Sequence, residues 1–165
     1  MKPVRTYEIR SVTLREQPTA VTDTTLSAEQ LGSWLATSYR AVAGVLGAQG
    51  TRPDGPPFAR YHPIGQGRFA VEAGFPVSAA IDDTGDVHPS VLPDGPAAST
   101  VHVGAYRELE SAYAALESWV RERGAEPAGD AWEVYPSDPA ARLDPATWRT
   151  EIVQPYRPAP PPAAR

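Results

Sequence analysis

Residues 99–124 read STVHVGAYRELESAYAALESWVRERG and place a strand, a turn and a helix in immediate succession. Valine alternates with polar residues up to Val103, which predicts a strand over Ser99–Val103. From Arg107 to Arg123 an apolar stripe recurs at helical spacing, formed by Leu109, Tyr113, Leu116 and Val120, and Gly124 stands where a C-terminal cap falls. The stretch therefore predicts a strand that turns at Gly104 into a long helix.

A second helix is predicted earlier in the chain, over Ser27–Gly47, where Ser27 and Gln30 form a capping-box start. Strand-like stretches surround both helices, so that a unit of strand, helix, strand and strand occurs twice. We expect a short additional strand over Asp86–Leu92, between the two copies. The first copy comprises Tyr7–Leu14, Ser27–Gly47, Pro57–His62 and Arg68–Val77, and the second comprises Ser99–Val103, Arg107–Arg123, Trp132–Tyr135 and Thr150–Gln154.

Composition limits the class of protein. The chain has 165 residues, 41% of them hydrophobic, which suits one domain with its own core. It lacks a signal peptide and any apolar run of membrane-spanning length, so we expect a cytoplasmic protein that does not contact membranes. A net charge of −5 argues against direct nucleic-acid binding. Without cysteine, and without metal-ligand spacing among the three histidines, we expect neither a metal nor a cofactor.

The C-terminal end differs in composition from the rest. Residues 157–165 contain four prolines and no large apolar side chain. We therefore expect one domain over residues 1–156, followed by a disordered Pro/Ala-rich tail over residues 157–165.

The second half of the chain resembles a known family. The run His102-Val103-Gly104-Ala105-Tyr106 is similar to a His-x-Gly-x-Tyr signature that precedes a helix. The strand Trp132-Glu133-Val134-Tyr135, the pair Asp138-Pro139 and the closing Thr150-Glu151-Ile152 complete the pattern. Together they resemble the GyrI-like, or effector-binding, family, which also forms the C-terminal part of multidrug-sensing transcription regulators.

The resemblance implies a fold and a ligand class. The fold is α+β: a pseudo-two-fold duplication of a β-α-β-β unit, with a curved antiparallel sheet, two long helices on one face and a ligand pocket on the concave face. The ligands are small aromatic or cationic lipophilic molecules. Because no helix-turn-helix segment precedes the first expected strand, we expect a stand-alone member, as a monomer or weak dimer.

Glu133 is the first candidate site residue, since the resemblance makes it the acidic residue of the pocket. Its neighbours Trp132 and Val134 need burial, so the strand is not expected at an exposed edge. If Val134 faces the helices, Glu133 and Tyr135 point to the opposite face. A carboxylate there needs a ligand cation or tyrosine hydroxyls as partners.

Aromatic side chains make up the rest of the predicted site, because flat rings suit planar and cationic ligands. We expect Trp34, Trp119 and Trp148 in the core instead. His102 has an equally good structural interpretation, as a hydrogen-bonding residue beside the turn at Gly104. The predicted ligand-binding residues are Tyr39, Tyr61, Phe69, Phe75, His102, Tyr106, Glu133 and Tyr135.

Two functional hypotheses follow from this site. The first is a non-catalytic binder that senses or sequesters aromatic compounds. The second is a hydrolase that opens electrophilic cyclopropane rings, as some members of the family do, with Glu133 as general base and Tyr135 or Tyr106 donating a hydrogen bond. A third hypothesis, modulation of gyrase by protein contact, rests on the family name alone.

Overall fold

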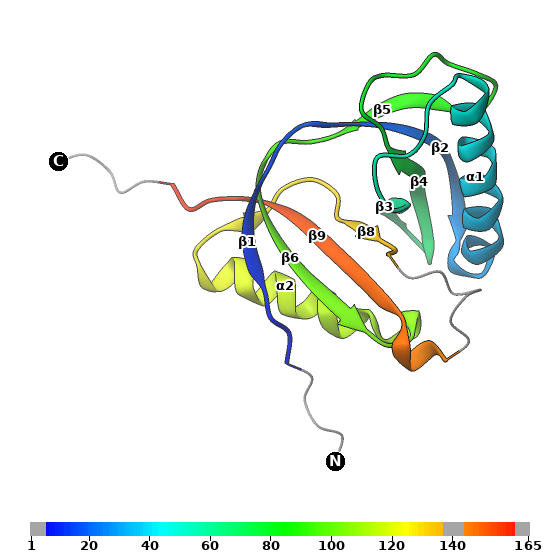
Figure 1. Cartoon of the computed structure of the whole chain (residues 1–165). Coiled ribbons are helices and arrows are strands. Elements are labelled where there is room, and N and C mark those ends of the chain that lie inside the picture. The colour runs from blue at the N-terminus through cyan, green and yellow to red at the C-terminus, as the bar shows by residue number, and fades with distance from the viewer. Residues whose placement is uncertain (1–5, 137–143, 161–165) are drawn as a thin grey trace.

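The computed structural model describes residues 6–136 and 144–160. An antiparallel sheet curls through the molecule, with α1 beside one half and α2 beside the other (Figure 1). The strand order is β1-β6-β9-β8-β3-β4-β2-β5, and β7 pairs with β9. In chain order the elements are β1 (Arg10–Leu14), β2 (Gln17–Ser27), α1 (Ala28–Ala48), β3 (Phe58–Gly65), β4 (Arg68–Pro76), β5 (His88–Leu92), β6 (Gly95–Val103), the 3-10 helix η1 (Tyr106–Glu108), α2 (Glu110–Glu122), β7 (Glu126–Pro127), β8 (Trp132–Val134), the 3-10 helix η2 (Pro145–Thr147) and β9 (Arg149–Arg157).

The predicted α+β duplication is confirmed, with one correction. The two copies are β2-α1-β3-β4 and β6-α2-β8-β9, and they meet where β3 pairs with β8. The strand expected over Tyr7–Leu14 does not open the first copy, because β1 pairs with β6 of the second copy. The opening strand is β2, which the sequence did not indicate. The additional strand over Asp86–Leu92 is confirmed as β5.

The sequence does not indicate strand β2 because the first half of the strand is buried on both faces. Four consecutive residues, Thr19 to Thr22, are buried, so the stretch QPTAVTDTTLS shows no alternation of polar and apolar residues. Pro18 stands near its start, and proline usually counts against a strand. A strand buried on both faces lacks the period-two pattern on which strand prediction depends.

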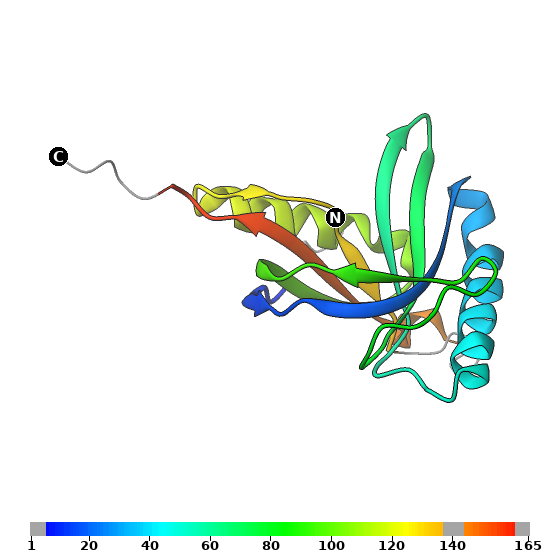
Figure 2. The same cartoon turned by 90° about the horizontal axis from the view of Figure 1, so that it is seen from above.

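Two long ribbons connect the halves. β1 leads into β2 after two residues, and β5 leads into β6 in the same way. Pairing runs from Arg10↔Ser99 to Leu14↔Gly95 and continues from Gln17↔Leu92 to Val21↔His88. The β1–β2 ribbon therefore lies along the β5–β6 ribbon over its first part (Figure 2). Each leading strand pairs with the other copy, which closes the sheet into a half-barrel.

The sheet buries apolar side chains on both faces. On the helix-bearing face, α1 packs Val42 and Leu46 against Ala20, and α2 packs Leu116 and Val120 against the other half of the sheet. The inner face of the curl has a separate core with no helix residue among its members. The buried members of this inner core are Val21, Phe58, Leu92, Ala97, Trp132 and Val153.

The helices begin and end close to the predicted positions. The Ser27 N–H donates to Gln30 Oε1 at 3.1 Å, as the capping box requires. The second helix starts with the turn η1 before α2 proper. Among the described residues, neither helix combines the length and the apolar character needed to cross a bilayer.

The last strand extends one residue into the expected tail. Arg157, expected to open the disordered tail, belongs to β9 and forms an ion pair with Glu126 in β7. Residues 161–165 of the expected tail and the pair Asp138-Pro139 lie outside the described residues.

Gly74 of β4 provides a test of the sheet packing. A Cβ added there would lie 1.8 Å from the carbonyl oxygen of Ala20 in β2, so the backbone must shift to accept it. We expect Gly74→Ala to lower the free energy of unfolding by about 1–3 kcal/mol or more, measured by urea denaturation.

The control is Gly44→Ala on α1, where nothing lies within 4 Å of the added Cβ. This helical change should raise stability by up to about 1 kcal/mol. Equal stability of the two variants would contradict the close approach of β2 and β4.

Candidate ligand-binding site

Glu133 lies on β8, in the middle of the sheet. It stands opposite Ala59 of β3 and Ile152 of β9, and both of these residues belong to clusters that pack against helices. Glu133 therefore faces the helices, and the expectation that Val134 faces them is wrong. Val134 packs into the inner core with Trp132. Alternation separated the two faces correctly but could not tell which face the helices cover, because both are buried.

Three phenol groups satisfy the Glu133 carboxylate in a chain of hydrogen bonds. The Tyr113 hydroxyl, from α2, donates to Glu133 Oε2. The Tyr135 hydroxyl donates to Oε1 at 2.8 Å and stands 2.5 Å from the Tyr61 hydroxyl. Because the Tyr135 hydroxyl uses its hydrogen in the bond to the carboxylate, the Tyr61 hydroxyl is the donor in its hydrogen bond with Tyr135. Glu133 is only 8% exposed, so these hydroxyls replace the water that its carboxylate loses on folding.

Further aromatic rings extend from this centre in two directions. Tyr39 of α1 donates to the carbonyl of Phe58 at 3.0 Å, and its ring meets Phe75 edge-on at 5.7 Å. The ring of Phe69 lies 6.3 Å from that of Tyr61. On the other side Tyr106 lies 5.8 Å from Tyr135 and 4.8 Å from Trp148.

The duplication explains how this centre is built. Equivalent positions of the two copies lie the same number of residues apart in the sequence. This holds for the buried positions of the two helices, which are Ser38, Val42 and Leu46 in α1 and Ala112, Leu116 and Val120 in α2. The same separation pairs Tyr39 with Tyr113 and Tyr61 with Tyr135, and the β3–β8 register agrees with it. It also pairs Glu133 with Ala59. The tyrosines are thus repeated in both copies, whereas the carboxylate is present in one copy only and faces a methyl group in the other.

The sequence matches one family over nearly its whole length. The model of the GyrI-like small molecule binding domain covers residues 7–157. The chain belongs to the GyrI-like family. Among curated proteins none matches the sequence.

Solved structures share the fold of this GyrI-like domain at low identity. EcmrR in its complex with DNA is 20% identical with a TM-score of 0.76; the match covers 93% of this chain and 58% of that one. The EcmrR C-terminal domain alone has a TM-score of 0.74 at 20% identity, and coverage of 93% and 99%. A hydrolase encoded by lin2189 from Listeria innocua has a TM-score of 0.70 at 15% identity, and the match covers 91% of this chain and 92% of that one. SAV2435 bound to tetraphenylphosphonium has a TM-score of 0.58 at 12% identity, and the match covers 93% of this chain and 94% of that one.

Most of the predicted site residues of this GyrI-like domain lie close together around Glu133. Glu133, Tyr135 and Tyr61 share one hydrogen-bond chain, and Tyr39 and Tyr106 flank it. Phe69 and Phe75 form the outer ring contacts. His102 is fully buried, and its Nδ1 lies 2.9 Å from the Tyr7 hydroxyl while its Nε2 lies 3.2 Å from the carbonyl of Ala105. These bonds favour the structural interpretation of His102.

Two site residues were missed in the sequence. The sequence predicts Tyr113 in the apolar stripe of the helix and Trp148 in the core. Tyr113 does lie on the packed face, but its hydroxyl reaches Glu133. The available signal was a tyrosine, rather than leucine, at a buried helical position, since a buried phenol needs a hydrogen-bond partner. Trp148 is half-buried against Tyr106.

Burial controls the charge state of the site. It raises the pKa of the Glu133 carboxyl above its ordinary value, and the hydrogen bonds from Tyr113 and Tyr135 oppose part of this rise. Burial also raises the pKa of the phenols of Tyr39, Tyr61, Tyr113 and Tyr135 far above the usual value, and the Glu133 charge raises each of them further. The phenols are therefore neutral donors. Within residues 6–136 and 144–160, no group of three acidic or histidine side chains is placed to hold a metal.

The raised pKa of Glu133 predicts a pH-dependent stability. The folded protein holds the Glu133 proton more tightly than the unfolded chain, so folding is favoured at low pH. This stability is lost as pH rises from the unfolded value of about 4.3 through the folded pKa. Glu133→Gln should match the parent near pH 4 and become more stable than the parent as pH rises, in thermal unfolding followed by circular dichroism. The exposed Glu16→Gln serves as the control. A parent-minus-variant difference that does not change with pH would contradict the raised pKa.

Proposed function

We propose that this GyrI-like domain binds lipophilic aromatic cations at Glu133. The observation that carries the proposal is a buried carboxylate whose described partners are all neutral phenols. Within the described residues no arginine, lysine or histidine forms an ion pair with it. A carboxylate that has been desolvated but not neutralised attracts a cation more strongly than an exposed one does, because the local dielectric constant is low.

The rings around Glu133 favour an aromatic ligand over a small hydrated ion. The Tyr135 hydroxyl contacts both Glu133 and the Tyr61 hydroxyl, and the ring of Tyr106 lies 5.8 Å from the ring of Tyr135. An aromatic face attracts a cation by about 0.5–2 kcal/mol, depending on desolvation. Stacking also demands less exact geometry than hydrogen bonding, so such a site accepts ligands of several shapes. The tyrosine repeated in each copy supplies rings on both sides of the charge.

Ligand entry must displace part of the tyrosine chain, because the carboxylate is already enclosed. A cation that reaches Oε1 or Oε2 replaces the hydrogen bond from Tyr135 or Tyr113 and leaves that hydroxyl free to turn toward the ligand. The net exchange is favourable when the ion pair outweighs a single hydrogen bond of about 1 kcal/mol. SAV2435 bound to tetraphenylphosphonium, a protein of the same fold, supports this ligand class.

Tetraphenylphosphonium and the neutral triphenylphosphine oxide test the electrostatic part of the proposal. We expect calorimetry to show micromolar binding of the cation to the parent, and binding weakened by about tenfold to a hundredfold in Glu133→Gln. The neutral compound should bind both proteins equally. Glu16→Gln makes the same change in net charge at an exposed position and should bind the cation as the parent does. Equal cation affinity in Glu133→Gln and the parent would refute a role for the carboxylate.

A second candidate function, hydrolysis of strained electrophilic rings, is favoured by the proton chain Tyr61–Tyr135–Glu133. A carboxylate with a raised pKa is a suitable general base near neutral pH. Glu133 would take a proton from water, and the water oxygen would bond to a cyclopropane carbon. The breaking carbon–carbon bond would pass its electrons to the conjugated carbonyl, whose oxygen would accept a hydrogen bond from Tyr135 or Tyr106 and then take up the proton held by Glu133. The lin2189 hydrolase shares the fold.

Mass spectrometry of the protein incubated with a cyclopropane-bearing alkylator separates the two functions. If the domain is a hydrolase, ring-opened product with one added water should accumulate, and Glu133→Gln should slow it by about 10²–10⁴-fold. Tyr135→Phe should retain the fold and lose part of the rate. Substrate that remains intact with the parent, in a preparation that binds tetraphenylphosphonium, would leave binding as the function.

A further inference from the structure

One edge of the sheet is open within the described residues. β2 pairs with β4 along Thr19–Ser27, but on its other side it pairs with β5 only from Gln17 to Val21. The Pro18 carbonyl accepts from Val77 N–H at 3.0 Å, beside β4, so even-numbered residues of β2 direct their backbone groups to that side. Because a strand alternates these directions, Asp23 and Thr25 direct their N–H and C=O groups to the open side.

The corresponding stretch of the second copy is covered. The segment that precedes β1 runs beside β6, where the Thr100 hydroxyl donates to the carbonyl of Glu8 at 2.8 Å and Tyr7 reaches His102. In the first copy the segment that precedes β5 turns away instead. Thr84 and Val87 close a tight turn, and Gln49 at the end of α1 binds the carbonyl of Asp82 at 2.9 Å. The open edge of β2 is therefore a departure from the symmetry of the fold.

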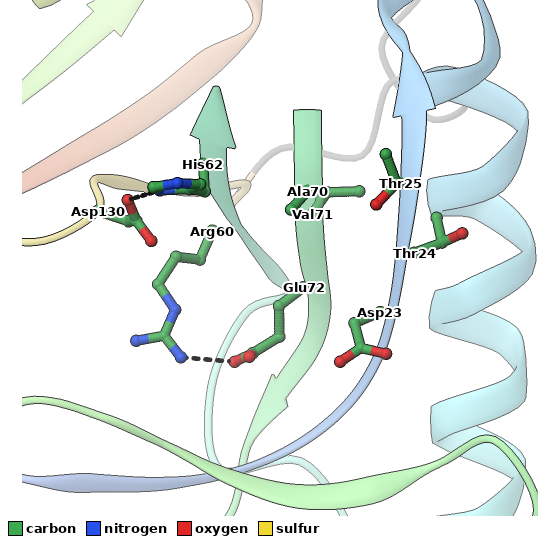
Figure 3. A pocket seen from close by; sticks show the side chains of 9 residues that line it. All are labelled: Asp23, Thr24, Thr25, Arg60, His62, Ala70, Val71, Glu72 and Asp130. Carbon is green, nitrogen blue, oxygen red and sulfur yellow. Dashed lines mark hydrogen bonds and ion pairs between the residues drawn. The ribbon is translucent and has the colours of Figure 1, made fainter. Parts of the chain in front are cut away.

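Two cavities flank this edge, and Thr24 and Thr25 line both of them. The first, of about 550 Å³, lies on the inner face beside Asp23 and Thr25 (Figure 3). The second, of about 580 Å³, lies between β2 and α1, and Leu26 and the indole of Trp34 line it. A strand added to the edge would place alternate side chains in the two cavities, because successive residues point to opposite faces.

The two cavities favour different side chains. The inner cavity holds three carboxylates, of Asp23, Glu72 and Asp130, against one arginine. Arg60 already binds Glu72 at 2.9 Å, and His62 binds Asp130 at 2.7 Å, as Figure 3 shows. Asp23 is 62% exposed, with His88 at 3.6 Å. The inner cavity thus suits a basic side chain, whereas the cavity beside Trp34 suits an apolar one.

We propose that the open edge of β2 captures an extended peptide of alternating basic and apolar residues as an additional strand. The backbone groups of Asp23 and Thr25 pair with the peptide, its basic side chains enter the acidic inner cavity, and its apolar side chains lie against Trp34. A second copy of the chain fits less well. Pairing β2 with itself about a two-fold axis would bring two acidic inner cavities together in a protein of net charge −5.

A blocked hexapeptide of alternating valine and lysine, added to the ¹⁵N-labelled full chain, tests the proposal. We expect NMR shift changes and slower amide exchange at Asp23 and Thr25, whereas Thr22 and Thr24, which already pair with β4, should change little. A peptide with glutamate in place of lysine should bind at least about tenfold more weakly, and Asp23→Asn should weaken the lysine peptide. Failure of the lysine peptide to bind at millimolar concentration would overturn the proposal.

Two controls distinguish strand addition from general attraction between opposite charges. The same lysine peptide, N-methylated at alternate amides, keeps its charge but loses the donors that strand pairing needs. Thr25→Pro removes an N–H from the open side without removing one that faces β4. Each change should weaken binding by about tenfold or more. Unchanged binding of the methylated peptide would refute strand addition, whether or not the proline variant folds. Dimerisation of the chain alone, lost in Thr25→Pro, would assign the edge to a second copy and overturn the peptide proposal.

Discussion

Burial of a single carboxylate, Glu133, is the constraint around which this domain is arranged. A charge removed from water needs partners, and here they come from three parts of the fold: Tyr113 from α2, Tyr135 from the residue directly after β8, and Tyr61, through Tyr135, from β3. The partners are neutral phenols, so the negative charge is solvated without being cancelled. Among the described residues, the carboxylate of Glu133 has hydrogen-bond donors but no positively charged partner.

The duplicated architecture supplies the frame, and its asymmetries supply the chemistry. Tyrosines recur at equivalent positions of the two copies, but only one copy has a carboxylate, and Ala59 stands at the matching position of the other. Two carboxylates directly opposite each other would repel and force one of them to hold a proton. A second asymmetry is the edge of β2, where no described residue gives the cover that the segment around Tyr7 gives to β6. Both departures from symmetry lie where we propose that another molecule binds.

The elements that could be predicted are those marked by a pattern of neighbouring residues in the sequence itself. Both helices, the hairpin of β3 and β4 and the short β5 were found because periodicity, capping residues and glycine turns mark them. β2 was missed, since burial of both faces over Thr19–Thr22 removes the alternation of polar and apolar residues there. The direction of Glu133 was wrong for a related reason: Trp132 and Val134 need burial, yet a second core on the inner face provides it without helices. Tyr113 was read as core because its spacing matches the apolar stripe, and only the fold brings its hydroxyl to the carboxylate.

The exchange of leading strands between the two copies affects how the chain reaches its native state. β1 is completed by β6, and β5 by β2, so neither copy carries all of its own sheet partners. The ladder between the two ribbons joins residues nearly ninety positions apart at its far end, from Arg10 to Ser99. Contacts of such long range slow folding, because the loop must close before pairing returns any free energy. During synthesis the first half therefore remains without all of its strand partners until β8, which pairs with β3, has left the ribosome. The repeated unit, though visible in the architecture, therefore depends on the other copy for part of its strand pairing.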